Sequence, residues 1–231
     1  MRERGDLKCF HEPFMYDYYI NRKIRLMPYF EPESDRPVTY QQVRDMLLEQ
    51  SEFASVFLKD MSYYVMPHLL DDKELGERLV NCFLIRNPVA SIASYFKLDS
   101  EVTSEEIGLQ AQFEHYDALC KSSGIQPVVV EAEYIRANPR RVINALWDQI
   151  GLPRADHAFE WGNDSPQDWN QVAGWHGDVS ASVGVRPITP EELETQSKNF
   201  ANLSKQYPRM RECLDHHLPY YEALKARSIK C

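Results

Sequence analysis

The chain has 231 residues, of which 43% are hydrophobic and 26% are charged, a composition that supports a packed core and excludes a wholly disordered chain. Its formal net charge of −9 disfavours a protein that follows a nucleic-acid backbone, so an anionic ligand has to find a local basic pocket. No apolar run is long enough to span a membrane, and the N-terminus lacks the apolar stretch of a secretory signal. We therefore expect a soluble, cytoplasmic protein.

Four short apolar runs, each followed by charged residues, predict β-strands. They cover residues 7–10, 56–58, 82–85 and 128–130. Continuous apolar runs of this kind are typical of parallel strands whose two faces are both covered by helices. The sequence therefore predicts an α/β fold with a parallel β-sheet flanked by helices, in a single domain that covers residues 1–231.

The segments between these runs carry helix start signals. A capping residue or an early proline opens five of them, at Thr39 with Gln42, Asn87-Pro88, Thr103 with Glu106, Asn138-Pro139, and Thr189-Pro190 with Glu192. Helical spacing then predicts two core-facing stripes, Leu109, Phe113, Tyr116 and Cys120 in one segment and Val142, Ile143, Leu146, Trp147 and Ile150 in another. The periodicity fades between residues 154 and 187, which predicts an irregular region before two closing helices.

The spacing of cysteines and glycines excludes several kinds of site. The five cysteines show neither Cys-x-x-Cys spacing nor metal-type clustering, so they predict reduced thiols and no metal site. Cys9 and Cys82 lie within apolar runs and are expected to be buried. The nine glycines form neither a dinucleotide-binding pattern nor a Walker loop, which argues against a nucleotide kinase.

Ionisable residues follow each predicted strand. Because the carboxyl ends of parallel strands and the helix N-termini behind them form the ligand sites of α/β folds, these positions are candidates for chemistry. They are His11 and Glu12, Lys59 and Asp60, Arg86, and Glu131 with Glu133.

The third strand end is the most informative. Arg86 stands at the predicted strand tip, Asn87 begins a helix, and Ser91 and Ser94 lie within its first turns. A guanidinium group, free N–H groups at a helix N-terminus and serine hydroxyls together suit a monophosphate group. The alternative interpretation is an ordinary strand-to-helix turn with an N-cap and a surface arginine.

Several segments resemble, in order and spacing, the sulfotransferases that use 3′-phosphoadenosine 5′-phosphosulfate (PAPS). Arg86 and Ser94, within Ile-Arg-Asn-Pro-x5-Ser-Tyr-Phe, are similar to the family's 3′-phosphate motif. The other matching segments are Gly5-Asp6, His-Glu-Pro-Phe at 11–14, Leu-Lys-Asp-Met at 58–61, 131–135 ahead of Asn138-Pro139, and Ile-Gly-Leu-Pro at 150–153. The resemblance covers about residues 5–161 and implies a P-loop-type fold.

The sequence departs from this family at its start. The family's first strand and 5′-phosphosulfate loop stand further upstream than the ten residues before His11 allow. The resemblance therefore implies a domain without the first strand and loop. Three explanations stay open: Met1 lies within the first helix of a longer polypeptide, the chain is a degenerate homologue without cofactor, or it is a fragment of a larger protein.

The resemblance also implies roles for the candidate residues. It assigns Arg86 and Ser94, supported by Asn87 and Ser91, to the 3′-phosphate of PAPS or of its product adenosine 3′,5′-bisphosphate. In the transfer of a sulfuryl group to a hydroxyl or amine of a small-molecule acceptor, Lys59 would contact the sulfuryl oxygens or the bisphosphate. The base would be Asp60 or His11, and no metal would be required.

Structural interpretations compete with these catalytic roles. Asp60 could cap the next turn, Lys59 could be a solvated charge, and His11 could belong to a structural pair with Glu12. The alternative function is a catalytically inactive binding module that retains the 3′-phosphate pocket. Residues 16–36 and 161–186, rich in tyrosine and tryptophan, are candidates for the acceptor site, and residues 175–186 stand where the family has a cofactor loop.

Overall fold

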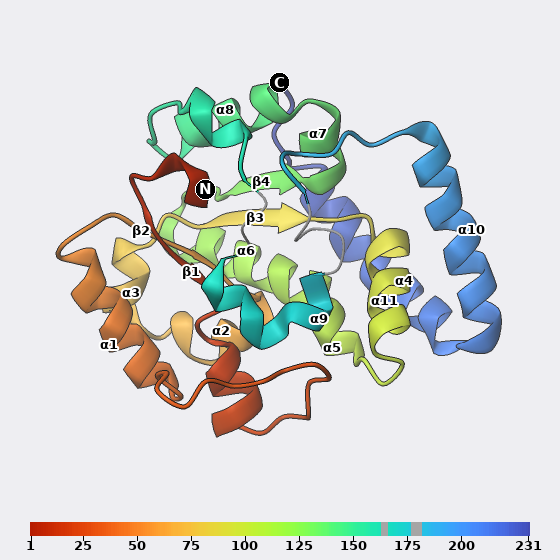
Figure 1. Cartoon of the computed structure of the whole chain (residues 1–231), viewed down its shortest axis with the longest axis horizontal. Coiled ribbons are helices and arrows are strands. Elements are labelled where there is room, and N and C mark those ends of the chain that lie inside the picture. Colours follow the sequence, from red (N-terminus) through yellow and green to blue (C-terminus); the bar gives the residue numbers. More distant parts are fainter. Residues whose placement is uncertain (163–165, 177–181) are drawn as a thin grey trace. The chain divides into compact units, whose positions relative to one another are not determined.

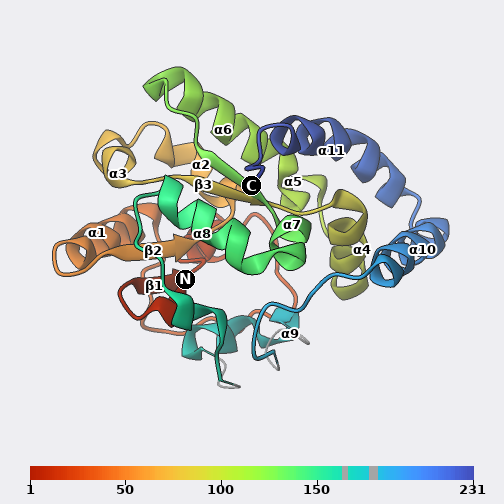
Figure 2. The same ribbon diagram turned by 90° about the horizontal axis from the view of Figure 1, so that it is seen from above.

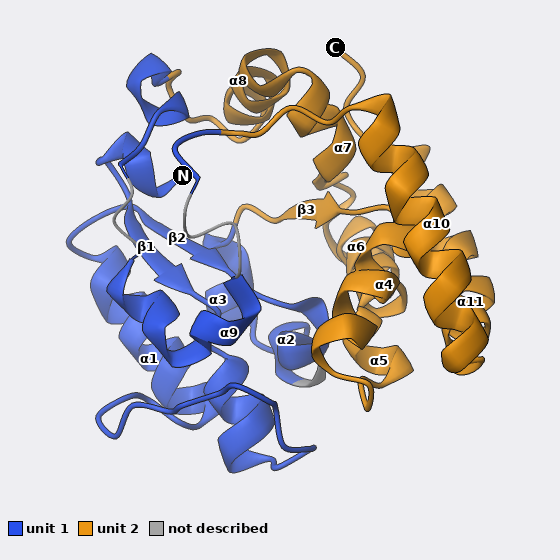
Figure 3. Cartoon of the chain, turned by 45° about the vertical axis from the view of Figure 1, so that its right-hand side comes forward, with its two compact units in different colours: residues 1–79, 155–184 blue, residues 80–154, 185–231 orange. Residues whose placement is uncertain are grey.

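The computed structural model of the chain describes residues 1–162, 166–176 and 182–231 (Figure 1). It is a mixed α/β structure with four short strands among helices, as the sequence predicts. The contacts divide the chain into two compact units (Figure 3). Unit 1 consists of residues 1–79 and 155–184, and unit 2 consists of residues 80–154 and 185–231.

Unit 1 contains the first two strands and mostly short helices. Its elements are η1 (Arg2–Arg4), β1 (Lys8–His11), η2 (Asp17–Asn21), α1 (Tyr40–Ser51), β2 (Val56–Lys59), α2 (Ser62–Leu69), α3 (Lys73–Arg78), η3 (Asp156–Phe159), η4 (Gln167–Val172) and α9 (Ala173–His176). The last three occupy the region in which the sequence shows no periodicity. Short helical turns are the form that this irregular region takes.

Unit 2 contains the other two strands and the longer helices. Its elements are β3 (Cys82–Ile85), α4 (Pro88–Leu98), α5 (Ser104–Ile107), α6 (Leu109–Ser123), β4 (Val128–Glu131), α7 (Ala132–Ala137), α8 (Pro139–Gln149), α10 (Pro190–Gln206) and α11 (Arg209–Lys225). Among the described residues, no helix has both the length and the apolar character that a membrane span requires.

The four strands pair in parallel, as predicted, but they form two pairs rather than one hydrogen-bonded sheet. In unit 1, β1 pairs with β2, and His11 lies opposite Lys59. In unit 2, β3 pairs with β4, and Ile85 lies opposite Glu131. Each run carries the apolar pattern of a parallel strand, but such a pattern does not specify which neighbour the strand pairs with.

The predicted helix starts agree with the structure. Thr39 and Thr103 each form a complete capping box, and the side chain of Thr189 accepts a hydrogen bond from the backbone N–H of Glu192. Asn87 caps α4 and is followed by proline at the first helical position. These local signals were sufficient because a capping side chain bonds within its own first turn.

The two faces of the β3–β4 pair are covered unequally. Phe83 and Val129 point into a core formed with α4, α6, α10 and α11. On the other face Val130 packs against α8, and Figure 2 shows α7 and α8 on the opposite side of the pair from α6 and α11. Cys82 and Leu84 face this second side and remain exposed, so the expectation that Cys82 is buried was wrong. In β3, buried and exposed side chains alternate, and the strand is stabilised by the burial of one of its faces.

The core of unit 1 is rich in aromatic side chains. Tyr18 is buried among Tyr19, Tyr63 and Tyr64, with ring centroids 4.8, 5.3 and 5.0 Å away. Such edge-to-face and tilted contacts stabilise aromatic clusters. Tyr16, Tyr18 and Tyr19 are therefore core residues, and the exposed part of segment 16–36 lies further along, where Leu26 is 91% exposed.

Candidate functional site

The end of the β1–β2 pair in unit 1 gathers charged side chains. Glu12 follows β1 and adopts a left-handed backbone conformation with φ 46°, which a residue with a side chain adopts only at a cost. Its buried carboxylate forms an ion pair with Lys59, and Oε1 lies 3.8 Å from Nε2 of His11. The parallel register places His11 and Lys59 opposite each other, so all three groups share one strand end.

Burial and charge set the protonation of this group. Burial lowers the pKa of His11 to about 4, although the neighbouring Glu12 opposes that shift, so the ring is neutral at pH 7. Burial raises the pKa of Glu12, but Lys59 and His11 outweigh it, so the net shift is downward. Lys59 and Glu12 are therefore a charged pair beside a neutral histidine.

Asp60 has different surroundings. Its Oδ2 accepts a hydrogen bond from the backbone N–H of Phe14 at 3.0 Å, and its Oδ1 accepts one from the backbone N–H of Met61 at 2.9 Å. Burial raises the pKa of Asp60 to about 8 despite these bonds, which favour the ionised form. Asp60 thus ties the end of β2 to the segment after β1, and each of its oxygens already has a donor.

Two aromatic residues that the sequence did not single out as site residues lie against His11. The rings of Trp169 and His176 stack with centroids 4.2 Å apart, and the His11 ring lies 5.7 Å from the first and 5.2 Å from the second. They come from η4 and α9, in the region without periodicity. Both lie within residues 161–186, the segment that its tryptophans made a candidate for the acceptor site.

A close contact holds α9 against the segment around residue 29. A Cβ atom at Gly174 would lie 2.7 Å from Cβ of Tyr29, so a larger residue would force the two apart. Nearby, Nε1 of Trp175 donates a hydrogen bond to the carbonyl of Pro28 at 2.7 Å. These contacts fix the helix that carries His176.

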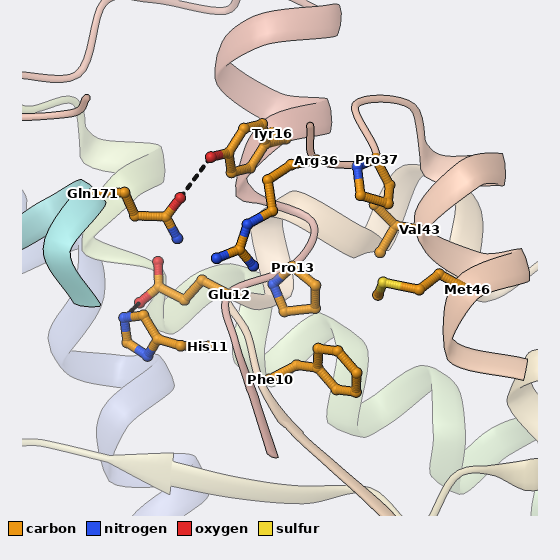
Figure 4. Close-up of a pocket in the computed structure, with 10 residues that line it drawn as sticks. All are labelled: Phe10, His11, Glu12, Pro13, Tyr16, Arg36, Pro37, Val43, Met46 and Gln171. Atoms are coloured by element: carbon orange, nitrogen blue, oxygen red, sulfur yellow. Dashed lines mark hydrogen bonds and ion pairs between the residues drawn. The ribbon is translucent and has the colours of Figure 1, made fainter. Parts of the chain in front are cut away.

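A small cavity of about 30 Å³ lies beside His11 and Glu12 (Figure 4). Tyr16 donates a hydrogen bond to Gln171 at 2.6 Å on one side of it, and the guanidinium group of Arg36 points between Gln171 and Glu12. This volume accommodates one or two water molecules. His11 lines the cavity and Asp60 does not, so His11 is the more accessible of the two predicted bases.

At the end of the β3–β4 pair in unit 2, two side-chain donors are available for a ligand. Arg86 and Ser94 are exposed, and within the described part of the chain neither has a hydrogen bond or an ion pair. Asn87 and Ser91 are half-buried, and both are engaged: Asn87 caps the backbone N–H of Val89, and the hydroxyl of Ser91 donates to main-chain carbonyls. A guanidinium and a hydroxyl therefore remain available for an anion.

The backbone N–H groups at the start of α4 are not available, which corrects the expectation of free donors there. Pro88 has no N–H, and that of Val89 is bound by the side chain of Asn87. The N–H groups of Ala90 and Ser91 donate to the carbonyl of Asn87 at 3.1 and 3.0 Å. An anion at this turn would be bound by side chains and by the helix dipole rather than by these N–H groups.

Two carboxylates follow β4. Glu131 is buried and accepts hydrogen bonds from Ser228 and Lys230, both at 2.8 Å. Glu133 accepts a bond from the backbone N–H of Asn87 at 3.1 Å. Both line an open cavity of about 450 Å³, completed by Tyr134, Ala137, Ile188, Leu193 and Lys230.

Arg136 fixes one wall of this cavity. Its guanidinium pairs with both carboxylate oxygens of Glu192 at 2.6 Å and donates to the carbonyls of Arg186 and Pro187. The bidentate pair holds the first turn of α10 against α7, and the two carbonyl bonds hold the segment before it. Residues 177–181 of the predicted cofactor loop lie outside the described residues, as do residues 163–165 of the second predicted acceptor segment.

The site residues thus form two groups. Unit 1 holds His11, Lys59 and Asp60, and unit 2 holds Arg86, Asn87, Ser91 and Ser94. No group of three or more His, Cys, Asp or Glu side chains in the described residues has an arrangement suited to a metal ion.

Comparison with known proteins identifies the family. The family model described as "Sulfotransferase domain" matches residues 1–228, so the chain belongs to the sulfotransferase domain family. It is 25% identical over 159 residues, or 66% of its length, to "Branched-chain-amino-acid aminotransferase-like protein 1" of Arabidopsis thaliana, and spans about a quarter of that protein. A solved structure, "Sulfotransferase Domain from the Curacin Biosynthetic Pathway", aligns with a TM-score of 0.41 and 16% identity over 72% of this chain and 68% of that chain.

Proposed function

Because the chain is a sulfotransferase domain, we propose that it binds PAPS and transfers the sulfuryl group to a hydroxyl or amine of a small-molecule acceptor. The observation that carries the proposal is the pair Arg86 and Ser94, two exposed donors on one strand-to-helix connection that form no hydrogen bond or ion pair within the described residues. Arginine donors arranged as a fork, together with a hydroxyl, suit the oxygens of a phosphate monoester. Arg86 and Ser94 would hold the 3′-phosphate.

The supporting residues would shape this turn rather than bind the ligand. Asn87 uses its side chain to cap α4, and Ser91 bonds to the backbone within the helix. Both keep the turn between Arg86 and Ser94 in one conformation. A fixed turn reduces the entropy lost when the ligand binds.

Unit 1 offers the base. His11 is neutral at pH 7 and lines a cavity, so its ring can accept a proton, and the Glu12 carboxylate lies 3.8 Å from its Nε2. Asp60 already receives a backbone N–H on each oxygen, so we assign it to holding the strand end. Lys59 neutralises Glu12 and would reach the sulfuryl oxygens only if that pair opens.

PAPS supplies the activated sulfuryl group, and the reaction leaves adenosine 3′,5′-bisphosphate. The acceptor's oxygen or nitrogen attacks sulfur, the bond from sulfur to the bridging oxygen breaks, and the acceptor's proton passes to the base.

A thermal-shift titration with adenosine 3′,5′-bisphosphate tests the binding site. A ligand that binds only the folded chain raises its stability, by about 2.7 kcal/mol at a hundred times the dissociation constant. We expect a saturable rise in Tm for the wild-type chain and for Arg211→Ala, an exposed arginine on α11, and none for Arg86→Ala. A folded wild-type chain that shows no shift would refute the proposal.

Transfer itself needs a second measurement. Incubation with radiolabelled PAPS and mixed phenol, alcohol and amine acceptors should give labelled product that depends on His11. Binding without any transfer would instead support the inactive binding module, with the 3′-phosphate pocket retained.

A further inference from the structure

The turn that carries Arg86 is fixed from outside its own segment. Asn87 and Glu133 each stand two residues beyond the register pair Ile85 and Glu131, so the parallel strands bring them side by side. The backbone N–H of Asn87 donates to Oε1 of Glu133 at 3.1 Å. This bond joins the β3–α4 turn to the first turn of α7.

The same carboxylate is unusual in another respect. Its second oxygen, Oε2, is buried and has no hydrogen-bond partner. A buried acceptor without a donor is destabilising, and native structures contain few of them.

The bond to Glu133 adds to the hydrogen bonds that fix the conformation of the β3–α4 turn. The side chain of Asn87 caps Val89, its carbonyl accepts from Ala90 and Ser91, and its N–H is bound by Glu133. The backbone N–H, the backbone carbonyl and the side-chain oxygen of Asn87 are therefore all bonded. Arg86, the preceding residue, starts from a fixed backbone position.

We propose that Glu133 is a positioning residue for the proposed 3′-phosphate site, and that its Oε1 bond to the Asn87 N–H fixes the backbone from which the Arg86 side chain reaches the phosphate. This inference rests on the proposed function. The proposed role depends on the oxygen of Glu133 that accepts the hydrogen bond and not on its negative charge. A carboxylate close to an anion site repels the anion. The geometry therefore predicts opposite effects for two substitutions of one residue.

Glu133→Ala removes the acceptor, and Glu133→Gln keeps an amide oxygen in its place without the charge. We expect Glu133→Ala to weaken binding of adenosine 3′,5′-bisphosphate about tenfold, measured by calorimetry, as the Arg86 turn loosens. We expect Glu133→Gln to bind as tightly as wild type or up to about threefold more tightly, with the gain largest at low salt. Glu222→Ala, at an exposed position of α11, makes the same change in net charge and should bind as wild type.

A readout independent of ligand accompanies the affinities. Amide hydrogen exchange at Asn87, followed by NMR, should accelerate in Glu133→Ala and stay slow in Glu133→Gln. A purely structural role would lower the Tm of Glu133→Ala and leave the affinity of the folded variant unchanged. That result, or Glu133→Gln binding as weakly as Glu133→Ala, would overturn the inference.

The two proposals fail in different ways. A wild-type chain that binds no bisphosphate overturns the proposed function. A wild-type chain that binds it, loses binding with Arg86→Ala and keeps full affinity with Glu133→Ala overturns only the role of Glu133.

Discussion

The two strand ends of this chain use their charged residues in opposite ways. In unit 1, Lys59 and Glu12 form an ion pair beside a neutral His11, and Asp60 is bonded to the backbone. In unit 2, Arg86 is exposed and uncommitted within the described residues. A charge at the end of a parallel strand is therefore not by itself a ligand group, because its partners decide whether it stabilises the fold or stays available.

The largest expected effect is on ligand affinity at the strand end of unit 2. Arg86→Ala should weaken binding of adenosine 3′,5′-bisphosphate about 100-fold, because it removes a charge-assisted donor pair. Its Tm without ligand should change little, since the side chain is exposed. Arg86→Lys keeps the charge but not the fork and should recover only part of the affinity. A large fall in Tm for Arg86→Ala would show that Arg86 is structural after all.

At the strand end of unit 1, substitutions should change the stability of the fold. Lys59→Met keeps the apolar stem but leaves the buried Glu12 carboxylate without its main partner, so we expect a loss of about 2 kcal/mol in urea unfolding. The double variant Lys59→Met with Glu12→Gln should recover most of it. If the single and the double variant both unfold at the same urea concentration as the wild-type chain, the ion pair contributes nothing to the stability of unit 1.

Ser94→Ala tests the contribution of a neutral donor to the same phosphate site. Loss of one uncharged hydrogen bond to a phosphate should weaken bisphosphate binding about fivefold and leave unfolding unchanged. Ser91→Ala is the matched control, because the Ser91 hydroxyl bonds to the backbone of its own helix. Equal losses of affinity in both variants would contradict the distinction between them.

The effect that is smallest at pH 7 is the one at His11, because it develops only as the pH falls. The pKa of His11 is about 4 in the folded chain against 6.5 ordinarily, so the unfolded chain binds more protons between these values. The stability that a neutral His11 contributes is complete above pH 6.5 and is lost as the pH falls towards 4. Tm measured from pH 7 to 4 should fall less steeply for His11→Gln than for wild type. An unchanged slope would place His11 in contact with water.

Much of the local structure could be predicted from the sequence because its causes are local. The capping boxes at Thr39 and Thr103 and the apolar stripe through Val142 and Leu146 formed as predicted, since each depends on neighbours within a few turns. Cys82 did not become buried, because burial depends on whether another element covers that face of β3. The contacts of Trp169 and His176 with His11 depend on segments more than 150 residues apart in the chain.

The sequence by itself determined the secondary structure, the parallel sense of the strands and the family, because these follow from periodicity, capping and motifs that are written along the chain. Only the tertiary structure decided which strands pair, which charges neutralise each other and which donors remain uncommitted. Glu133 binds Asn87, for example, across 46 residues of sequence. Hydrogen bonds and burial between distant segments depend on distances in space, and no spacing along the chain encodes those distances alone.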